Sequence, residues 1–115
     1  MQYLLMLYSS EKGWAELPQA EQSHWMAAYK AYTEALSSAG ALVGSNRLTD
    51  TDTATTVRVT NGKTQVLDGP YADSKEQLGG YYLIDAPDLD AAIAWAARCP
   101  GASHGAIEVR PVWSK

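Results

Sequence analysis

The sequence predicts an α+β fold of the ferredoxin-like type, a split βαβ arrangement with an added β-hairpin. Segments with strand and helix character follow one another in the order β-α-β-β-β-β-α-β. The Asn61-Gly62 pair is a strong hairpin signal between the third and fourth strands. Two of the strands are apolar on both faces, which indicates a sheet covered on both sides. The length fits one domain, residues 1–115.

The first half of the chain supplies a strand, a helix and a second strand. Residues 3–8, YLLMLY, are apolar at odd and even positions alike, so both faces of a strand here would be apolar. We therefore expect a central strand, followed by a loop over residues 9–18. Residues 21–39 form the first helix, and Gly40 is placed to end it. The second strand lies within residues 41–48. One apolar stripe at helical spacing runs along the helix: Trp25, Tyr29, Tyr32 and Leu36.

The middle of the chain predicts a hairpin and then a turn. Residues 53–60 are rich in β-branched side chains and form the third strand, and residues 63–67 form the fourth. Gly69-Pro70 reverses the chain. The pattern Asp73-Ser74-Lys75-Glu76 is that of a capping box and predicts the start of a short helix. Gly79-Gly80 ends that helical turn and lets the next strand, residues 80–85, pack closely against a neighbour.

The end of the chain predicts a helix and a last strand. Asp88 caps the second helix, and Pro100-Gly101 ends it. The side chains expected to face the core from this helix are Leu89, Ile93, Ala96 and Ala97. Residues 106–113 form the last strand, with Ile107 and Val109 on one face and Glu108 and Arg110 on the other.

Two helices can cover only one face of such a sheet. Strands that are apolar on both faces need a cover on the second face as well. A second copy of the same sheet is the simplest cover, so the sequence favours a homodimer.

Composition and charge argue against several partners and cofactors. The net charge of −4 and the lack of a Lys/Arg cluster argue against nucleic acid. The apolar run at residues 3–8 is too short to span a membrane, and the lone Cys99 fits a reducing cytoplasm. Two histidines and one cysteine show no metal-binding spacing, and no glycine-rich phosphate loop precedes a helix. We therefore expect no metal, no other cofactor and no membrane partner.

One stretch carries a family resemblance, residues 68–85, DGPYADSKEQLGGYYLID. Together with Tyr3-Leu4-Leu5, residues 55–58 (TTVR) and residues 107–111 (IEVRP), it resembles the DGPF branch of the YCII-related (YciI-like) proteins along the whole chain. The resemblance implies a fold of the dimeric α+β barrel type, in which two sheets pack face to face. It does not assign a reaction, because most of this branch has no known chemistry.

Polar side chains on the inner face of a paired sheet are the candidate site. We expect substrate-binding roles for Arg58, Tyr71, Tyr81 and Arg110 and catalytic roles for Asp68 and His104. An arginine can hold an anionic group bidentately, while a carboxylate or a histidine moves a proton. The same charges could instead form a network that fixes the dimer register, and Asp68 could only hold its turn.

Two functions remain open at this point. The first is a small enzyme without a cofactor that uses acid–base catalysis on an organic acid, lactone or phenolic ligand. The second is a non-catalytic accessory or sensing protein, because genes of DGPF-type proteins often lie beside those of extracytoplasmic-function sigma factors.

The YciI branch is known for a histidine near the start of the first helix, paired with an aspartate. Counting back from Gly40 places Tyr29 nearer that position than His24.

Overall fold

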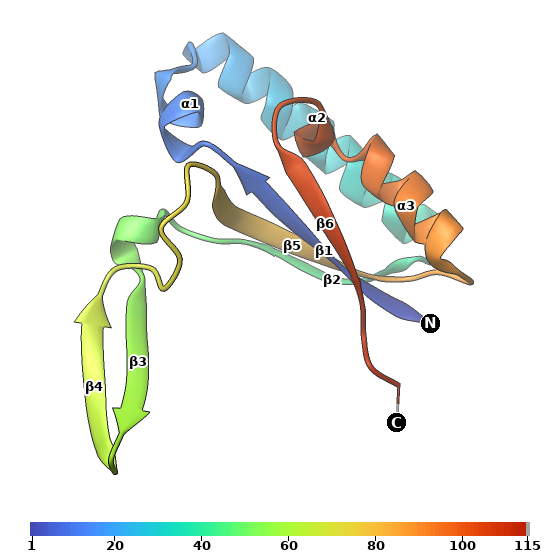
Figure 1. Ribbon diagram of the computed structural model, residues 1–115. Coiled ribbons are helices and arrows are strands. Elements are labelled where there is room, and N and C mark those ends of the chain that lie inside the picture. The colour runs from blue at the N-terminus through green and yellow to red at the C-terminus, as the bar shows by residue number, and fades with distance from the viewer. Residues whose placement is uncertain (115) are drawn as a thin grey trace.

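A four-stranded antiparallel sheet with helices on one face forms the body of the protein in the computed structural model, which describes residues 1–114 (Figure 1). The strands of this sheet lie in the order β2 (Leu42–Arg47), β5 (Gln77–Asp85), β1 (Gln2–Ser9) and β6 (Ala106–Pro111). The helices are α1 (Glu11–Glu16), α2 (Gln19–Ser38) and α3 (Leu89–Arg98), with 3₁₀ turns at Thr51–Thr53 and Pro100–Ser103. A separate hairpin joins β3 (Thr55–Thr60) to β4 (Lys63–Asp68).

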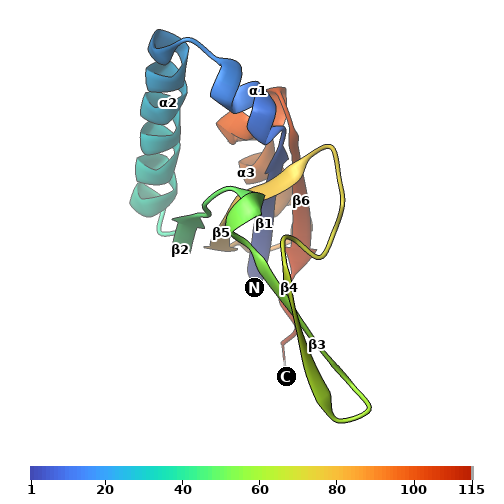
Figure 2. The same ribbon diagram turned by 90° about the vertical axis from the view of Figure 1, so that its left-hand side faces the viewer.

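This arrangement confirms the ferredoxin-like fold with an added hairpin. The hairpin follows β2 and precedes β5, and it projects away from the sheet and the helices (Figure 2). Its turn residues Asn61 and Gly62 have φ values of 52° and 75°, the left-handed pair that a tight two-residue hairpin turn requires. The molecule is consequently flat and wide, with extents of 47 × 45 × 18 Å.

Helix α1 replaces the loop that we expected over residues 9–18. Ser10 precedes it, and the Ser10 hydroxyl accepts a hydrogen bond from the Gly13 backbone N–H at 3.0 Å. This is an ordinary N-cap, but the helix has only 6 residues and includes a glycine. So short a segment shows no helical periodicity, and the prediction of a loop was wrong for that reason.

The predicted capping box at Asp73 and Glu76 is also wrong. Residues 69–76 form bends and irregular structure without a helix, and the Ser74 hydroxyl accepts the Glu76 N–H at 3.3 Å. Strand β5 already begins at Gln77, where it pairs with Ser9 of β1. Strand pairing therefore takes the residues that a helix would need, and the serine only stabilises a local turn.

Helix α3 faces the core with only one of the four residues expected, Ala96, because Leu89, Ile93 and Ala97 are exposed. Leu89 and Ile93 are 47% and 49% exposed, whereas Ala92 and Ala96 are buried. Small alanines allow the helix to lie close to the sheet, and Trp95 packs partly buried against the core beside them. The cap prediction is confirmed, because the Asp88 carboxylate accepts the Ala91 N–H at 2.8 Å.

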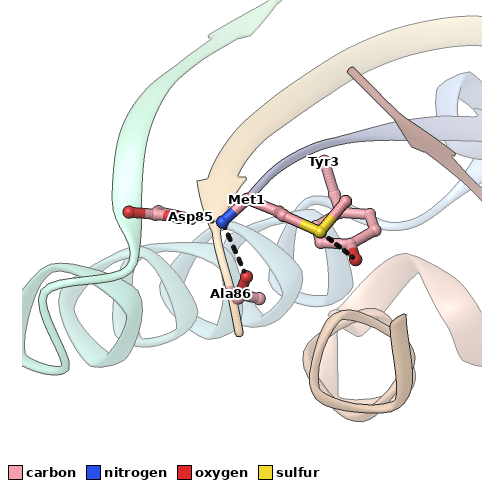
Figure 3. Close-up of polar contacts among 4 residues, drawn as sticks. All are labelled: Met1, Tyr3, Asp85 and Ala86. Atoms are coloured by element: carbon pink, nitrogen blue, oxygen red, sulfur yellow. Dashed lines mark hydrogen bonds and ion pairs between the residues drawn. The ribbon is translucent and has the colours of Figure 1, made fainter. Parts of the chain in front are cut away.

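The core lies between the helices and the sheet. Leu5, Leu36 and Ile84 are its fully buried large side chains, and they come from β1, α2 and β5. At the far end of the strands, the Met1 ammonium group donates to the Asp85 carboxylate at 3.0 Å and to the Ala86 carbonyl at 3.1 Å (Figure 3). These contacts fasten the start of β1 to the end of β5.

The other face of the sheet is open in the single chain. Helices α2 and α3 both lie on the opposite face (Figure 1). Leu4, Met6 and Leu83 point to the open face and are only half-buried. Glu108 and Arg110 share this face, where the guanidinium and the carboxylate form an ion pair at 2.8 Å. This face is more apolar than water-exposed sheet surfaces usually are.

Candidate functional site

A cleft of about 470 Å³ opens between α2 and the sheet, at the end of the strands away from the Met1 contacts. Helix α1 and the segment after β2 border its mouth. Its titratable side chains come from separate parts of the chain: Glu11, Tyr29, Lys30, Arg47, Asp50, Tyr81, Tyr82 and His104. Its walls also include Leu7, Trp14 and Met26. The lining thus combines apolar walls with many polar groups, and the volume lies in the range of small-molecule sites.

Small residues on the helix-facing side of β2 and β5 leave room for this cleft. Ser45 lies opposite Tyr82 in the strand register, and Arg47 lies opposite Gly80. A Cβ atom at Gly80 would lie 2.9 Å from the Asn46 carbonyl oxygen, so only glycine allows the two strands to approach this closely. Gly80 therefore shapes the floor of the cleft.

A chain of hydroxyl groups crosses the inner end of the cleft. The Thr33 hydroxyl donates to the Tyr29 carbonyl at 2.9 Å and lies 2.8 Å from the Tyr82 hydroxyl. Because Thr33 has one proton to donate, Tyr82 donates its proton to Thr33 and keeps lone pairs that can accept a hydrogen bond. Burial raises the pKa of Tyr82, so its hydroxyl is protonated near neutral pH.

Tyr29 is another tyrosine that lines the cleft. Burial is the main cause that raises its pKa to about 12, with further contributions from Cys99 and Tyr82. The Tyr29 hydroxyl packs against Gly101, where an added Cβ would lie 2.6 Å from it. Tyr29 can therefore donate a hydrogen bond into the cleft near neutral pH, whereas it is a poor base.

His104 reaches the cleft from the loop before β6. Its ring packs edge-on against Trp25 with centroids 4.8 Å apart, and its Nδ1 lies 3.5 Å from the Ser103 hydroxyl. Among residues 1–114, Nε2 has no hydrogen-bond partner. His104 is exposed, so this nitrogen is open to a ligand or to solvent. His24 contacts the same Trp25 ring at 5.4 Å but does not line the cleft.

Two charged residues shape the mouth of the cleft. The Glu11 carboxylate accepts both the backbone N–H and the hydroxyl of Thr51, at 2.7 and 2.9 Å. This pair of bonds holds the segment after β2 against α1. The Arg47 guanidinium lies over the Trp14 ring, 5.3 Å from its centroid.

The structure brings only some of the expected site residues together. His104 and Tyr81 line the cleft, and the Tyr81 hydroxyl accepts a hydrogen bond from the Asn46 amide at 2.8 Å. Asp68 ends β4, while Arg58 lies on β3 and stacks over the Tyr71 ring at 5.0 Å.

None of these three hairpin-region residues, Arg58, Asp68 and Tyr71, lines the cleft of its own chain. Arg110 lies on the open face of the sheet and pairs with Glu108. The expected substrate-binding and catalytic roles of all these residues stay predictions.

Sequence reasoning did not select several residues of the cleft. Tyr29 belonged to the apolar stripe of a helix, a pattern that normally indicates core. Arg47 is a single cation at the end of a strand, and Glu11 lay in a segment predicted as a loop. For these residues the sequence offered one signal. Counting back from Gly40 places Tyr29 near the position of the histidine for which the YciI branch is known.

Fold and cleft together define a small α+β protein with a ligand-sized hollow beneath a long helix. The chain belongs to the family of the YCII-related domain, whose model matches residues 1–114. An uncharacterized protein of Rhizobium meliloti (strain 1021) is 38% identical over an alignment of 114 residues, which covers 97% of this chain and 92% of the relative.

The fold also resembles a solved structure. This is the 5-chloro-2-hydroxyhydroquinone dehydrochlorinase of Burkholderia phenoliruptrix AC1100, in complex with 2,5-dihydroxybenzoquinone. The TM-score is 0.59 and the sequence identity 16%, with coverage of 99% of this chain and 94% of the other. At this level of identity, the likeness shows the fold alone.

Two further findings concern metals and membranes. Within residues 1–114, no group of three or more His, Cys, Asp or Glu side chains is placed to hold a metal ion. In the same part of the chain, no helix combines the length and apolar character needed to cross a membrane. Cys99 is buried, and burial raises the pKa of its thiol.

Proposed function

We propose that this protein binds a small organic molecule, an acid, lactone or phenol, in the cleft beneath α2. The observation that carries this proposal is the cleft itself, in which hydroxyl, imidazole and charged groups from distant segments meet around apolar walls. The dehydrochlorinase of similar fold was solved with a small quinone bound. That fold analogy supports a ligand of this size, although a fold by itself does not define a reaction.

The polar groups of the cleft suit proton transfer without a cofactor. Tyr29 donates a hydrogen bond to a ligand oxygen, and Tyr82 accepts one. His104 takes or returns a proton at Nε2. Glu11 is a weaker candidate for the base, because both of its oxygens are already engaged by Thr51.

We further propose that the protein is a cytoplasmic homodimer. A second copy would cover the open face with Leu4, Met6 and Leu83. It would also contact the hairpin, whose two strands are exposed at every residue except Thr56. An isolated two-stranded hairpin is at best marginally stable in water. In such a dimer, Arg58, Asp68 and Tyr71 could reach the second chain.

The lone, buried Cys99 supports the proposed location in the cytoplasm, because a free thiol fits a reducing compartment.

Binding is tested by filling the cleft. Calorimetric titration with phenol, benzoate and γ-butyrolactone is compared for the wild type, Ser45→Phe in the cleft and Ser37→Phe on the exposed end of α2. We expect at least one probe to bind the wild type and Ser37→Phe but not Ser45→Phe, since the larger ring occupies the cleft. Equal binding to both variants would place the ligand elsewhere and would contradict the proposal.

Catalysis is tested by exchange of the acidic C–H protons of γ-butyrolactone for deuterium in heavy water, followed by NMR. We expect His104→Gln to slow this exchange by about a hundredfold. His24→Gln is the matched control and leaves the rate unchanged. A wild type that binds the probe but catalyses no exchange would instead favour the non-catalytic, sensing function.

A further inference from the structure

The guanidinium of Arg47 is a cation that the fold holds in place without neutralising it. It stacks over Trp14, and its Nη1 donates to the Met26 sulfur at 3.5 Å. Within residues 1–114, no carboxylate lies within ion-pair distance of this guanidinium. Stacking restrains the group but leaves most of its N–H donors available, since a thioether is a weak acceptor.

The two carboxylates of the cleft, Glu11 and Asp50, do not pair with Arg47. Both oxygens of Glu11 are held by Thr51, and Asp50 at the cleft mouth is exposed and makes no ion pair within residues 1–114. Lys30 adds a second cation to the lining of the cleft. The cleft therefore offers a positive group at its mouth, although the whole chain carries a net charge of −4.

Arg47 also stands at a boundary between two hollows. Arg47, Trp14 and Met26 line both the main cleft and a shallower groove beside it, which is bordered by Gln19, Gln22 and Ser23. A ligand in the cleft would thus meet the guanidinium at the end that points to solvent. Its apolar part would lie deeper, against Leu7, Tyr29 and Tyr82.

We propose that Arg47 is the anion-binding residue of the cleft and that the natural ligand is a small carboxylic acid or an equivalent oxyanion with an apolar or ring-shaped body. This inference rests on the proposed ligand-binding function and narrows the ligand class within it. Arginine suits the role because its planar fork of donors matches the two oxygens of a carboxylate. The Trp14 stack reduces the conformational freedom that the guanidinium would lose on binding.

The test compares benzoate with benzamide, its neutral counterpart of similar shape. Both are titrated into the wild type, Arg47→Gln and Arg98→Gln, with binding followed by NMR chemical shifts. Arg98 is the matched control, because it also stacks on a tryptophan, Trp95, at 4.4 Å, but lies outside the cleft. We expect benzoate to bind the wild type and Arg98→Gln about tenfold more tightly than benzamide does. In Arg47→Gln, that preference disappears while benzamide binding is unchanged.

Three results would overturn the inference. If benzamide binds the wild type as tightly as benzoate, or if Arg47→Gln keeps the preference, the cleft binds ligands without using Arg47 for charge, and the ligand-binding function stands alone. If neither probe binds the wild type, both this inference and the proposed binding of ring-sized acids fail. Chemical shifts of the Trp14 indole N–H locate the bound probe and separate cleft binding from binding at the surface.

Discussion

Tyr29 links the stability of the fold to pH at the level of a single residue. Its pKa rises from 10.0 to about 12 on folding, mainly because the phenol is buried. The folded state therefore holds this proton more tightly than the unfolded state does. The associated stability is fully present below pH 10 and is lost as the pH rises through about 12.

The expected result is a melting temperature that falls between pH 10 and about 12. Tyr29→Phe should flatten part of this fall, because the variant has no phenolic proton to lose. Tyr71→Phe is the control, since Tyr71 is 75% exposed. Thermal denaturation followed by circular dichroism measures both variants. An identical alkaline profile for the wild type and Tyr29→Phe would show that other groups cause the loss.

At the scale of the element, the close approach of β2 and β5 depends on one glycine of the pair. A Cβ atom at Gly80 would lie 2.9 Å from the Asn46 carbonyl oxygen and 3.5 Å from the Arg47 Cα. A Cβ atom at Gly79 would meet nothing closer than the Leu7 carbonyl oxygen at 4.0 Å. The two neighbours in the sequence therefore have different physical roles.

We expect Gly80→Ala to lower the free energy of unfolding by about 1–3 kcal/mol, because the strands must move apart. Gly79→Ala should change it by no more than about 0.5 kcal/mol. Urea denaturation of both variants gives the two values. Because Gly80 lies opposite Arg47, Gly80→Ala should also weaken benzoate binding. Equal destabilisation by the two substitutions would mean that the strands tolerate the contact.

At the scale of the whole molecule, the flat single chain leaves two apolar surfaces in water. One is the open face of the sheet. The other is the hairpin, where Val57, Val59 and Val66 are 59%, 68% and 62% exposed. The strand register places these three valines on one face of the hairpin. Surfaces of this kind commonly mark a protein–protein contact.

Analytical ultracentrifugation should show a species of twice the chain mass at micromolar concentration. Val57→Lys should shift this equilibrium toward the monomer, because a buried lysine without a partner is costly at an interface. Ile93→Lys is the control, since Ile93 is 49% exposed and belongs to α3, a helix on the opposite side of the sheet from the open face. A monomeric wild type would contradict the homodimer. A dimeric Val57→Lys protein would exclude this face of the hairpin from the contact.

The sequence by itself determined the order of the main elements and several of their boundaries. Asn61-Gly62, Gly40 and Asp88 act through local backbone geometry and capping, so their effects can be predicted without knowing what lies nearby. Local signals failed where strand pairing outweighed them, as at Asp73 and Glu76. They also failed where segments were too short for periodicity, as in α1.

Only the tertiary structure decided which residues form the cleft. Tyr29, Arg47 and His104 are far apart in the sequence, and each has an ordinary local explanation as a stripe residue, a strand end or a loop histidine. They line one cleft because the ferredoxin-like topology carries α2, the end of β2 and the loop before β6 to the same end of the sheet. A sequence pattern predicts which single side chains are buried. A binding site depends instead on the distances among many side chains, which the sequence pattern does not give.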